Sequence, residues 1–227
     1  MIQNVQAIIF DLDGTLVESH GHWCTAEARL YELLGGVYDT AFAQFYQGKT
    51  ARDVGKAIHA QLKPAHLSAE DCGEILRHDV IASPLREVYA MPRAGEVLAR
   101  AQSAFRLAIA SGSPRELILE ILERFGWTHY FACVVSSEEV EYGKPAPDVF
   151  LEAARRLGVP PHTCVVVEDS RPGVEAAHRA FMPCIAVPYV TDKPLPIAFG
   201  LADLLYPEGM ATFDPGAAHA WLKQRMD

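Results

Sequence analysis

The chain has 227 residues, half of them hydrophobic and 22% charged, so it is long and apolar enough to bury a full core, and global disorder is not expected. Its formal net charge of −9 disfavours nucleic acid and anionic membranes as partners. The five cysteines are scattered without a C-x-x-C pair, and no apolar run reaches the roughly 18 residues of a membrane span, so we expect a cytoplasmic protein with free thiols.

The first predicted element is a short buried strand at Ile8–Phe10, where an apolar run contains two β-branched residues. The run stops at Asp11 and Asp13, which are two residues apart and point to the same side if the extended backbone continues. Two carboxylates so close together repel each other unless a cation lies between them, and Mg²⁺ prefers such oxygen ligands. The alternative is a simple Asp-Gly turn at Asp13 and Gly14.

Residues 17–89 have the pattern of four helices without strands. Apolar side chains recur at helical spacing, and glycine or proline ends the helices. The fourth helix begins at Ser68, which has the spacing of a capping box with Asp71. We therefore expect a small helical bundle, the cap domain, inserted into a core domain made of residues 1–16 and 90–227. The apolar positions of the first helix are Trp23, Ala26, Leu30, Leu33 and Leu34.

From residue 91 onward, short apolar runs alternate with amphipathic helices. Strands are expected at 107–110, 131–135, 164–167 and 184–187, with a weak one at 204–206. Helices are expected at 93–103, 114–125, 148–157 and 172–180, followed by a terminal helix from Asp214. Strands that are apolar throughout and separated by helices predict an α/β fold, with a doubly wound, Rossmann-like parallel sheet as its core.

Polar side chains follow four of these strands at their carboxyl ends, where open parallel sheets bind ligands. They are Asp11 and Asp13 after the first strand, Ser111 and Gly112 after the second, Lys144 in the loop after the third, and Glu168 and Asp169 after the fourth. Carboxylates that can hold a metal, a nucleophile, and donors for phosphate oxygens together suit phosphoryl transfer.

Four motifs in this order resemble the haloacid dehalogenase superfamily. They are DLDGTLV at 11–17, SGS at 111–113, GKPAPD at 143–148 and VEDSRPGVEAA at 167–177. The helical insertion directly after the first motif is similar to the branch of that superfamily that contains β-phosphoglucomutases and phosphatases. The resemblance covers most of the chain and implies a Mg²⁺-dependent enzyme that forms an aspartyl-phosphate intermediate.

The resemblance implies a role for each carboxylate. Asp11 is the expected nucleophile, and Asp13 is the expected general acid and base, which protonates the leaving alkoxide and then activates water. Asp11, the Asp13 backbone carbonyl and Asp169 are the expected Mg²⁺ ligands. Glu168 is also expected near the metal, either as a direct ligand or as a residue that contacts the direct ligands.

The resemblance further implies that Ser111 and the Gly112 amide bind the phosphoryl group at a helix N-terminus, where free N–H groups favour an anion. Lys144 is expected to offset the charge between Asp11 and the phosphoryl oxygens, which makes it both catalytic and substrate-binding. Ser113 is interpreted instead as the N-cap of the following helix, outside the site. Structural roles alone are expected for Thr15, Arg115, Ser170 and Arg171.

The cap is expected to select the substrate. Mutases of this branch hold a second phosphate with a lysine before a cap glycine and an arginine three residues after it. Around Gly48 those positions are Gln47 and Ala51, which favours a phosphatase for a small phosphorylated metabolite, a sugar phosphate or similar. A β-phosphoglucomutase-like mutase is the alternative. Substrate contacts stay open for four cap residues, namely His20, His22, Lys49 and Arg52.

A more distant alternative is a phospho-accepting signalling domain, which also combines a doubly wound sheet with an acidic cluster, a hydroxyl and a lysine. The acceptor aspartate of such domains follows the third strand. The loop after the third strand here has glutamates and no aspartate before Asp148. The sequence leaves the substrate unidentified and the oligomeric state as monomer or homodimer.

Overall fold

The computed structural model describes residues 4–189 and 194–224. Its centre is a six-stranded sheet in the order β5-β4-β1-β6-β7-β8, in which all neighbouring strands are parallel. The strands are β1 (Ala7–Phe10), β4 (Arg106–Ser111), β5 (Cys133–Ser136), β6 (Cys164–Glu168), β7 (Cys184–Ala186) and β8 (Leu204–Leu205). The expected parallel α/β core is confirmed. β5 begins two residues later than expected, and Phe131 packs its ring edge-on against Phe10 instead.

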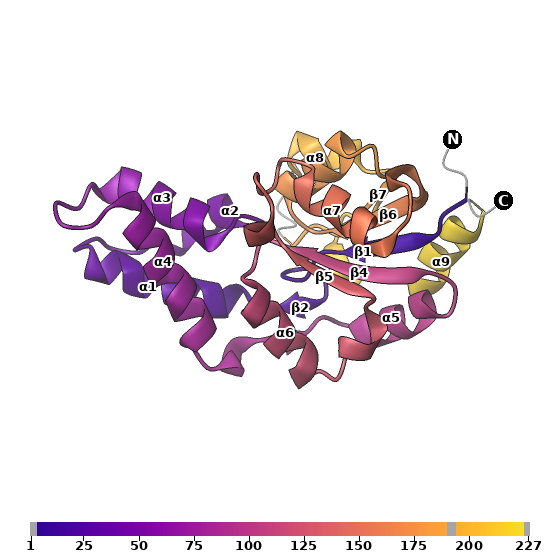
Figure 1. Ribbon diagram of the computed structural model, residues 1–227, viewed down its shortest axis with the longest axis horizontal. Helices are drawn as coiled ribbons and strands as arrows, with labels where there is room; N and C mark the ends of the chain where they lie inside the picture. The colour runs from indigo at the N-terminus through magenta and orange to yellow at the C-terminus, as the bar shows by residue number, and fades with distance from the viewer. Residues whose placement is uncertain (1–3, 190–193, 225–227) are drawn as a thin grey trace.

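Helices cover both faces of the sheet, which makes it doubly wound (Figure 1). α7 and α8 lie on one face, and α5, α6 and α9 lie on the other. The side chains of the strands alternate accordingly. Ile9 and Ala108 pack with α7 and α8, whereas Ile8 and Ile109 pack with the helices of the opposite face. The bounds are α5 (Ala94–Gln102), α6 (Arg115–Arg124), α7 (Asp148–Leu157), α8 (Arg171–Arg179) and α9 (Pro215–Lys223).

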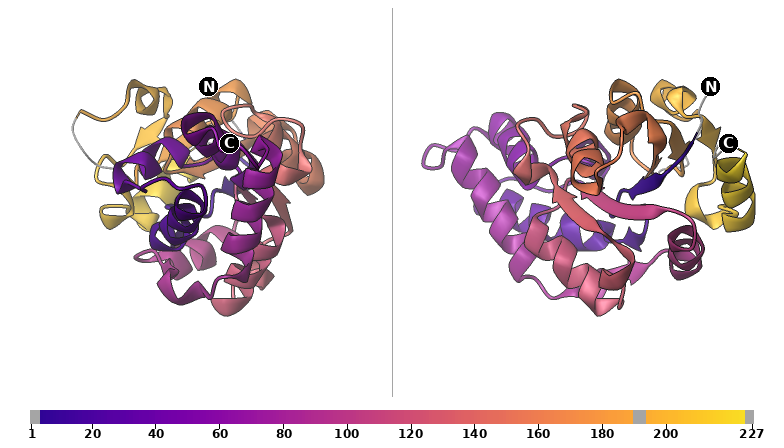
Figure 2. Two further views of the ribbon diagram at one scale, coloured as in Figure 1. Left: turned by 90° about the vertical axis from the view of Figure 1, so that its left-hand side faces the viewer. Right: turned by 45° about the vertical axis from the view of Figure 1, so that its right-hand side comes forward.

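Four further helices gather at one end of the molecule, and Figure 2 shows them opposite the end that holds α9. Ser68 caps the last of them as expected, because its hydroxyl accepts from the Asp71 N–H while the Asp71 carboxylate accepts from the Ser68 N–H. We refer to these helices as the cap helices. They are α1 (His20–Leu33), α2 (Ala43–Tyr46), α3 (Ala51–Leu62) and α4 (Ala69–Ala82).

Two expectations for this segment are wrong. The chain enters and leaves the cap helices through an antiparallel ribbon of β2 (Val17–Glu18) and β3 (Tyr89–Ala90), where no strand was expected. Strands of two residues are too short to show a periodicity. Leu33 is 61% exposed, because the buried face of α1 continues from Leu30 to Leu34. The ribbon lies at the junction between the predicted core and cap domains, and that division stays a prediction.

One cluster of ion pairs ties the cap helices to the core. Arg77 on α4 donates to Glu116 at 2.8 Å, at the start of α6, and to Glu138 at 3.1 Å, after β5. These groups are partly exposed, so the pairs contribute little to the free energy of unfolding. They do fix how α4 approaches the core.

The cysteines agree with the expectation from their spacing, because all five are free thiols. Cys72, Cys164 and Cys184 are buried, and burial raises the pKa of the Cys184 thiol above its ordinary range. These thiols therefore act as small apolar core groups. Within residues 4–189 and 194–224, none of the helices combines the length and the apolar character needed to cross a membrane.

Candidate active site

The site is built around Asp11, the residue that directly follows β1. From β1 the chain goes to β4 and β5 on one side and returns to β6 on the other, so the carboxyl end of β1 is the point at which the winding direction reverses. Loops diverge at such a point and leave a crevice for a ligand. The Asp11 N–H still donates to the Val167 carbonyl at 2.9 Å, which anchors the backbone of Asp11 to β6.

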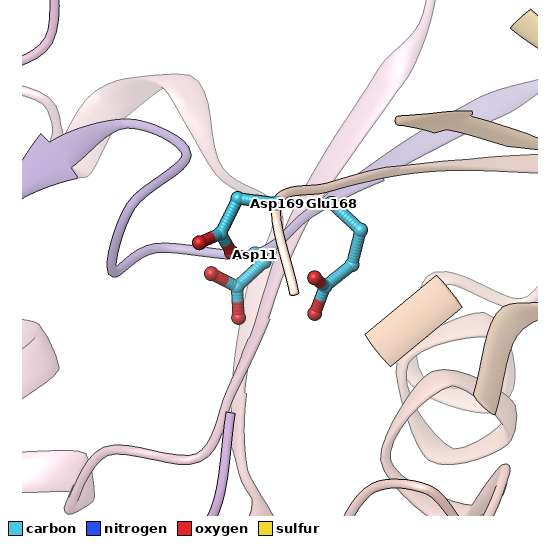
Figure 3. A group of neighbouring side chains, drawn as sticks. All are labelled: Asp11, Glu168 and Asp169. Atoms are coloured by element: carbon cyan, nitrogen blue, oxygen red, sulfur yellow. The ribbon is translucent and has the colours of Figure 1, made fainter. Parts of the chain in front are cut away.

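Three buried carboxylates meet in this crevice. Asp11, Glu168 and Asp169 each offer an oxygen within 4.8 Å of the others (Figure 3). The ammonium group of Lys144 lies 2.5 Å from Asp11 Oδ1 and 2.7 Å from Glu168 Oε1. With all four groups ionised, the negative charges exceed the positive by two. The cluster therefore has the charge and the hard oxygen ligands that suit a divalent cation such as Mg²⁺.

The electrostatics of the metal-free cluster show the same imbalance. Burial, followed by repulsion from neighbouring carboxylates, raises the pKa of Asp169 well above its usual range. Burial also raises the pKa of Asp11, although the nearby Lys144 acts in the opposite direction. For Lys144 itself, burial lowers the pKa but attraction to Asp11 and Glu168 outweighs it, so the pKa is raised and the side chain stays charged.

Glu168 is held on both of its oxygens by the protein. Oε1 accepts from Lys144, and Oε2 accepts from the Ser170 N–H at 2.6 Å and the Ser170 hydroxyl at 2.9 Å. Ser170 also caps α8 by accepting from the Gly173 N–H, so its expected structural role is confirmed. Glu168 is thus placed to orient Lys144 from behind Asp11.

Gly14 lets Asp169 reach the site. Its φ of +82° lies in the left-handed region that favours glycine. A Cβ at Gly14 would lie 2.1 Å from Asp169 Oδ2, which is far inside van der Waals contact. Thr15 supports the same carboxylate through a long hydrogen bond of 3.4 Å to Oδ1.

Asp13 is surrounded by hydroxyl groups. Ser19 donates to Oδ1 at 2.5 Å, while Ser111 and Ser113 donate to Oδ2 at 3.1 and 2.7 Å. The interpretation of Ser113 as a helix N-cap outside the site is wrong. Pro114 takes the N-cap position of α6, and one residue earlier the Ser113 hydroxyl is directed to Asp13 instead of to a free helix N–H.

A cavity of about 70 Å³ lies between these groups and the cap helices. Ser111 and Gly112 line it, as does Asp13, whereas Lys144 and Glu168 are not among the lining residues because they lie behind Asp11. The full lining is Asp11, Asp13, Gly14, Ser19, His20, Trp23, Glu27, Tyr46, Gln47, Gly48, Lys49, Ser111, Gly112, Ser113, Asp169 and Tyr189.

The four cap residues left open by the sequence separate into two groups. His20 and Lys49 line the cavity, whereas His22 and Arg52 are not part of its lining. His22 is buried inside the cap helices, where Nε2 lies 2.8 Å from the Val80 carbonyl oxygen. A direct substrate contact through His22 is therefore excluded in this arrangement.

The cap approaches the core closely at Gly112. A Cβ there would lie 2.8 Å from the Lys49 carbonyl oxygen and 3.0 Å from that of Gly48. The loop that carries Gly48 also approaches α8, because a Cβ at Gly48 would lie 2.7 Å from the Ser170 hydroxyl. The cavity is thus closed on this side by direct contact between cap and core.

Sequence reasoning missed several lining residues, and helical periodicity held the signal for two of them, Trp23 and Glu27, which share a helix face with His20. Residues 20, 23 and 27 share one face of α1 through steps of three and four. Trp23 is expected in the apolar core of the cap, and it does pack against that core, partly buried, while it also lines the cavity. Tyr46, at the end of the short helix α2, and Tyr189, in a loop, carry no comparable signal, because they come to the site from distant parts of the chain.

A comparison with known protein families shows to which family this chain belongs. A family model for haloacid dehalogenase-like hydrolases matches residues 5–180, a range that contains all four motifs and every carboxylate described above. The chain belongs to this family. The resemblance in the sequence is therefore confirmed, and the signalling-domain alternative loses its support.

Curated relatives of this haloacid dehalogenase-like hydrolase are named as phosphatases. Fructose-1-phosphate phosphatase YqaB of Escherichia coli (strain K12) is 31% identical over 191 residues, which are 82% of this chain and 98% of that protein. A phosphorylated carbohydrates phosphatase of Thermotoga maritima is 32% identical over 180 residues, or 78% of this chain and 82% of that protein.

Solved structures show the same fold as this hydrolase. CbbY from Rhodobacter sphaeroides in complex with phosphate superposes with a TM-score of 0.76 at 27% identity, covering 92% of this chain and 96% of that chain. β-Phosphoglucomutase from Clostridium difficile superposes with a TM-score of 0.82 at 20% identity, covering 97% of this chain and 98% of that chain. At that identity the second likeness concerns the fold alone.

Proposed function

We propose that this hydrolase is a Mg²⁺-dependent phosphatase that releases phosphate from small phosphorylated sugars or similar metabolites through an aspartyl-phosphate intermediate. The observation that carries the proposal is the pairing of Asp11 and Asp13 at the floor of one cavity. Around Asp11, Lys144 and two further carboxylates leave an excess of negative charge that a divalent cation balances. The phosphatase names of the sequence relatives support the same reaction.

Asp11 is the nucleophile in this proposal. One carboxylate oxygen bonds to phosphorus while the bond from phosphorus to the leaving alkoxide oxygen breaks. Lys144 holds Oδ1 and fixes the rotation of the side chain. Pre-orientation of this kind lowers the entropic cost of the attack.

Asp13 moves the proton. Its carboxyl group protonates the departing alkoxide, and the resulting carboxylate then takes a proton from the water that attacks phosphorus. That second attack breaks the bond between phosphorus and Asp11 and releases inorganic phosphate. Hydrogen bonds from Ser19 and Ser113 hold the Asp13 side chain toward the cavity.

Mg²⁺ would be held by Asp11, Asp169 and the backbone carbonyl of Asp13, with Glu168 behind Asp11. When bound, it supplies positive charge that stabilises the phosphoryl oxygens and keeps Asp11 ionised. Ser111 and the Gly112 amide, at the carboxyl end of β4, are proposed to bind the phosphoryl group. Five free thiols suit a reducing compartment, so we propose a cytoplasmic enzyme.

The principal alternative is a phosphosugar mutase of the β-phosphoglucomutase type. A mutase has to hold a second phosphate, but the cap positions that bear cations for it are Gln47 and Ala51 here. Ala51 is fully buried, and Arg52 does not line the cavity. We therefore favour hydrolysis over transfer.

The test is to incubate the protein and Mg²⁺ with a panel of sugar phosphates, phosphoglycolate and nucleotides. We expect release of inorganic phosphate, with sugar phosphates among the better substrates. In a parallel reaction with β-glucose 1-phosphate and a bisphosphate activator, glucose 6-phosphate is not expected to accumulate. Its accumulation in place of free phosphate would identify a mutase and overturn the proposal.

Replacing Gly112 with alanine is expected to lower kcat/KM for phosphate release by about tenfold or more, because the added methyl group displaces the cap loop from the core. The free energy of unfolding is expected to fall by about 1–3 kcal/mol, because the added methyl group meets backbone carbonyl oxygens that have to shift. Steady-state kinetics and urea unfolding measure the two effects. Gly95→Ala is the matched control, because a Cβ there meets only Trp127 at 4.0 Å. An unchanged kcat/KM in Gly112→Ala would contradict the assigned role of this contact.

A further inference from the structure

A buried carboxylate of the cap faces the same cavity. Glu27 is 2% exposed, and it lines the same cavity as Asp11 and Asp13. The Tyr38 hydroxyl donates to its Oε2 at 2.6 Å. Within the described ranges, Glu27 forms no ion pair with a lysine, arginine or histidine.

A carboxylate buried without a counter-charge is costly, so its presence at a cavity calls for a reason beyond packing. Burial raises the pKa of Glu27 to about 7, although the Tyr38 hydrogen bond acts in the opposite direction. A ligand group that donates a hydrogen bond to the carboxylate recovers part of the lost solvation. Glu27 therefore has the character of a binding group.

The position of Glu27 fits the far end of a small substrate. His20, Trp23 and Glu27 form one face of α1 along the cavity. Ser19, just before α1, bonds to Asp13. At a rise of about 1.5 Å per residue, Glu27 lies about 12 Å along the helix from that contact. A substrate that reaches from Asp13 to Glu27 would therefore extend along this face of α1.

The charges along the cavity have a direction. Lys49 also lines the cavity, and its backbone lies against Gly112, at the end where the phosphoryl group is expected. Glu27 lies about two helical turns along α1 from the contact between Ser19 and Asp13. A substrate that is anionic at its phosphoryl end and uncharged at its far end matches this arrangement.

We propose that Glu27 is a specificity-determining residue that selects phosphomonoesters whose far end carries hydroxyl donors and no second anionic group. The inference rests on the proposed function, because it assumes that Asp11 defines the phosphoryl end. A far hydroxyl donates to the Glu27 carboxylate. A second phosphate or a carboxylate there meets a like charge in a water-poor cavity, where repulsion is strong.

Binding tests the proposal without relying on turnover. In the Asp11→Asn background with Mg²⁺, calorimetry compares fructose 1-phosphate with fructose 1,6-bisphosphate, which differ only in the second phosphate. We expect the monophosphate to bind at least about tenfold more tightly, and Glu27→Gln to reduce that preference by about tenfold or more, because glutamine keeps the shape but not the charge. An unchanged preference in Glu27→Gln overturns the proposal, as does a failure to bind either compound.

Two control variants separate charge from structure. Glu32→Gln removes a charge from the exposed side of the same helix and is expected to keep the full preference. Tyr38→Phe removes the hydrogen bond that lowers the pKa of Glu27, so its preference is expected to remain when binding is compared at a pH well above 7, where Glu27 stays ionised. Loss of the preference in Tyr38→Phe but not in Glu27→Gln would assign the effect to packing and overturn the proposal. Binding selectivity without phosphate release by the unmodified protein would refute the phosphatase function and leave the role of Glu27 intact.

Discussion

Replacing Asp11 with asparagine is expected to reduce phosphate release by at least about a thousandfold, because the neutral amide oxygen is a poor nucleophile. The fold is expected to persist. Asparagine has nearly the same shape, its amide oxygen still accepts from Lys144, and the buried cluster loses one of three crowded negative charges. Turnover of an aryl phosphate with Mg²⁺ measures the loss, and circular dichroism checks the fold. Wild-type turnover in Asp11→Asn would rule out Asp11 as the nucleophile.

Asp13→Asn is the matched variant, and it separates the two proposed roles. An aryl phosphate has a leaving group that needs little protonation, so the first step continues while hydrolysis of the intermediate slows by about a hundredfold or more. We expect a burst of about one phenolate per active site, followed by slow turnover. Asp11→Asn is expected to show no burst. A burst in Asp11→Asn, or its absence in Asp13→Asn, would contradict the assignment.

The core of the fold was predictable because its signals are local. Strands buried on both faces have apolar interiors, as β4 has at 107–110 and β6 at 164–167, and the winding of a parallel sheet then brings their carboxyl ends together. That rule alone placed Asp11, Glu168 and Asp169 at one edge of the sheet, where they lie.

The missing parts of the site depend on tertiary contacts that a linear pattern does not record. Ser113 was assigned to a helix cap from its position, although its hydroxyl reaches Asp13 across the sheet edge. Trp23 and Glu27 were not recognised as cavity residues because the periodicity of α1 gives its face but not what that face meets. The two-residue strands of the ribbon carry too few residues for any pattern.

Removing divalent cations with a chelator is expected to abolish phosphate release, and restoring Mg²⁺ is expected to recover it. Mg²⁺ is also expected to stabilise the folded protein, by about 2.7 kcal/mol at a concentration one hundred times the dissociation constant. For a chain of this length that corresponds to a rise in Tm of roughly 5–10 °C. Differential scanning calorimetry with and without Mg²⁺ measures the shift, and Asp169→Asn is expected to lose most of it.

The pH dependence of the free energy of unfolding, measured without Mg²⁺, tests the excess of negative charge in the buried carboxylate cluster. The pKa values of Asp11 and Asp169 are raised in the folded state above the ordinary value of 3.8, so the folded state binds more protons than the unfolded state above that value. Stability therefore falls as the pH rises toward and through the raised pKa values, and it recovers on acidification until the ordinary range is reached. Glu27 adds a further fall in stability between pH 4.5 and about pH 7.

Bound Mg²⁺ favours the ionised carboxylates and is expected to remove the contribution of Asp11 and Asp169 to this slope. Urea unfolding from pH 5 to 8, with chelator and with saturating Mg²⁺, measures the difference between the two slopes. Glu27→Gln serves as the control. It leaves the cluster of three carboxylates intact and removes only the contribution of Glu27 to the pH slope. Identical slopes with and without Mg²⁺ would show that the cation does not bind among these carboxylates. A divalent cation bound beside Asp11 and Asp169 necessarily shifts their proton affinity.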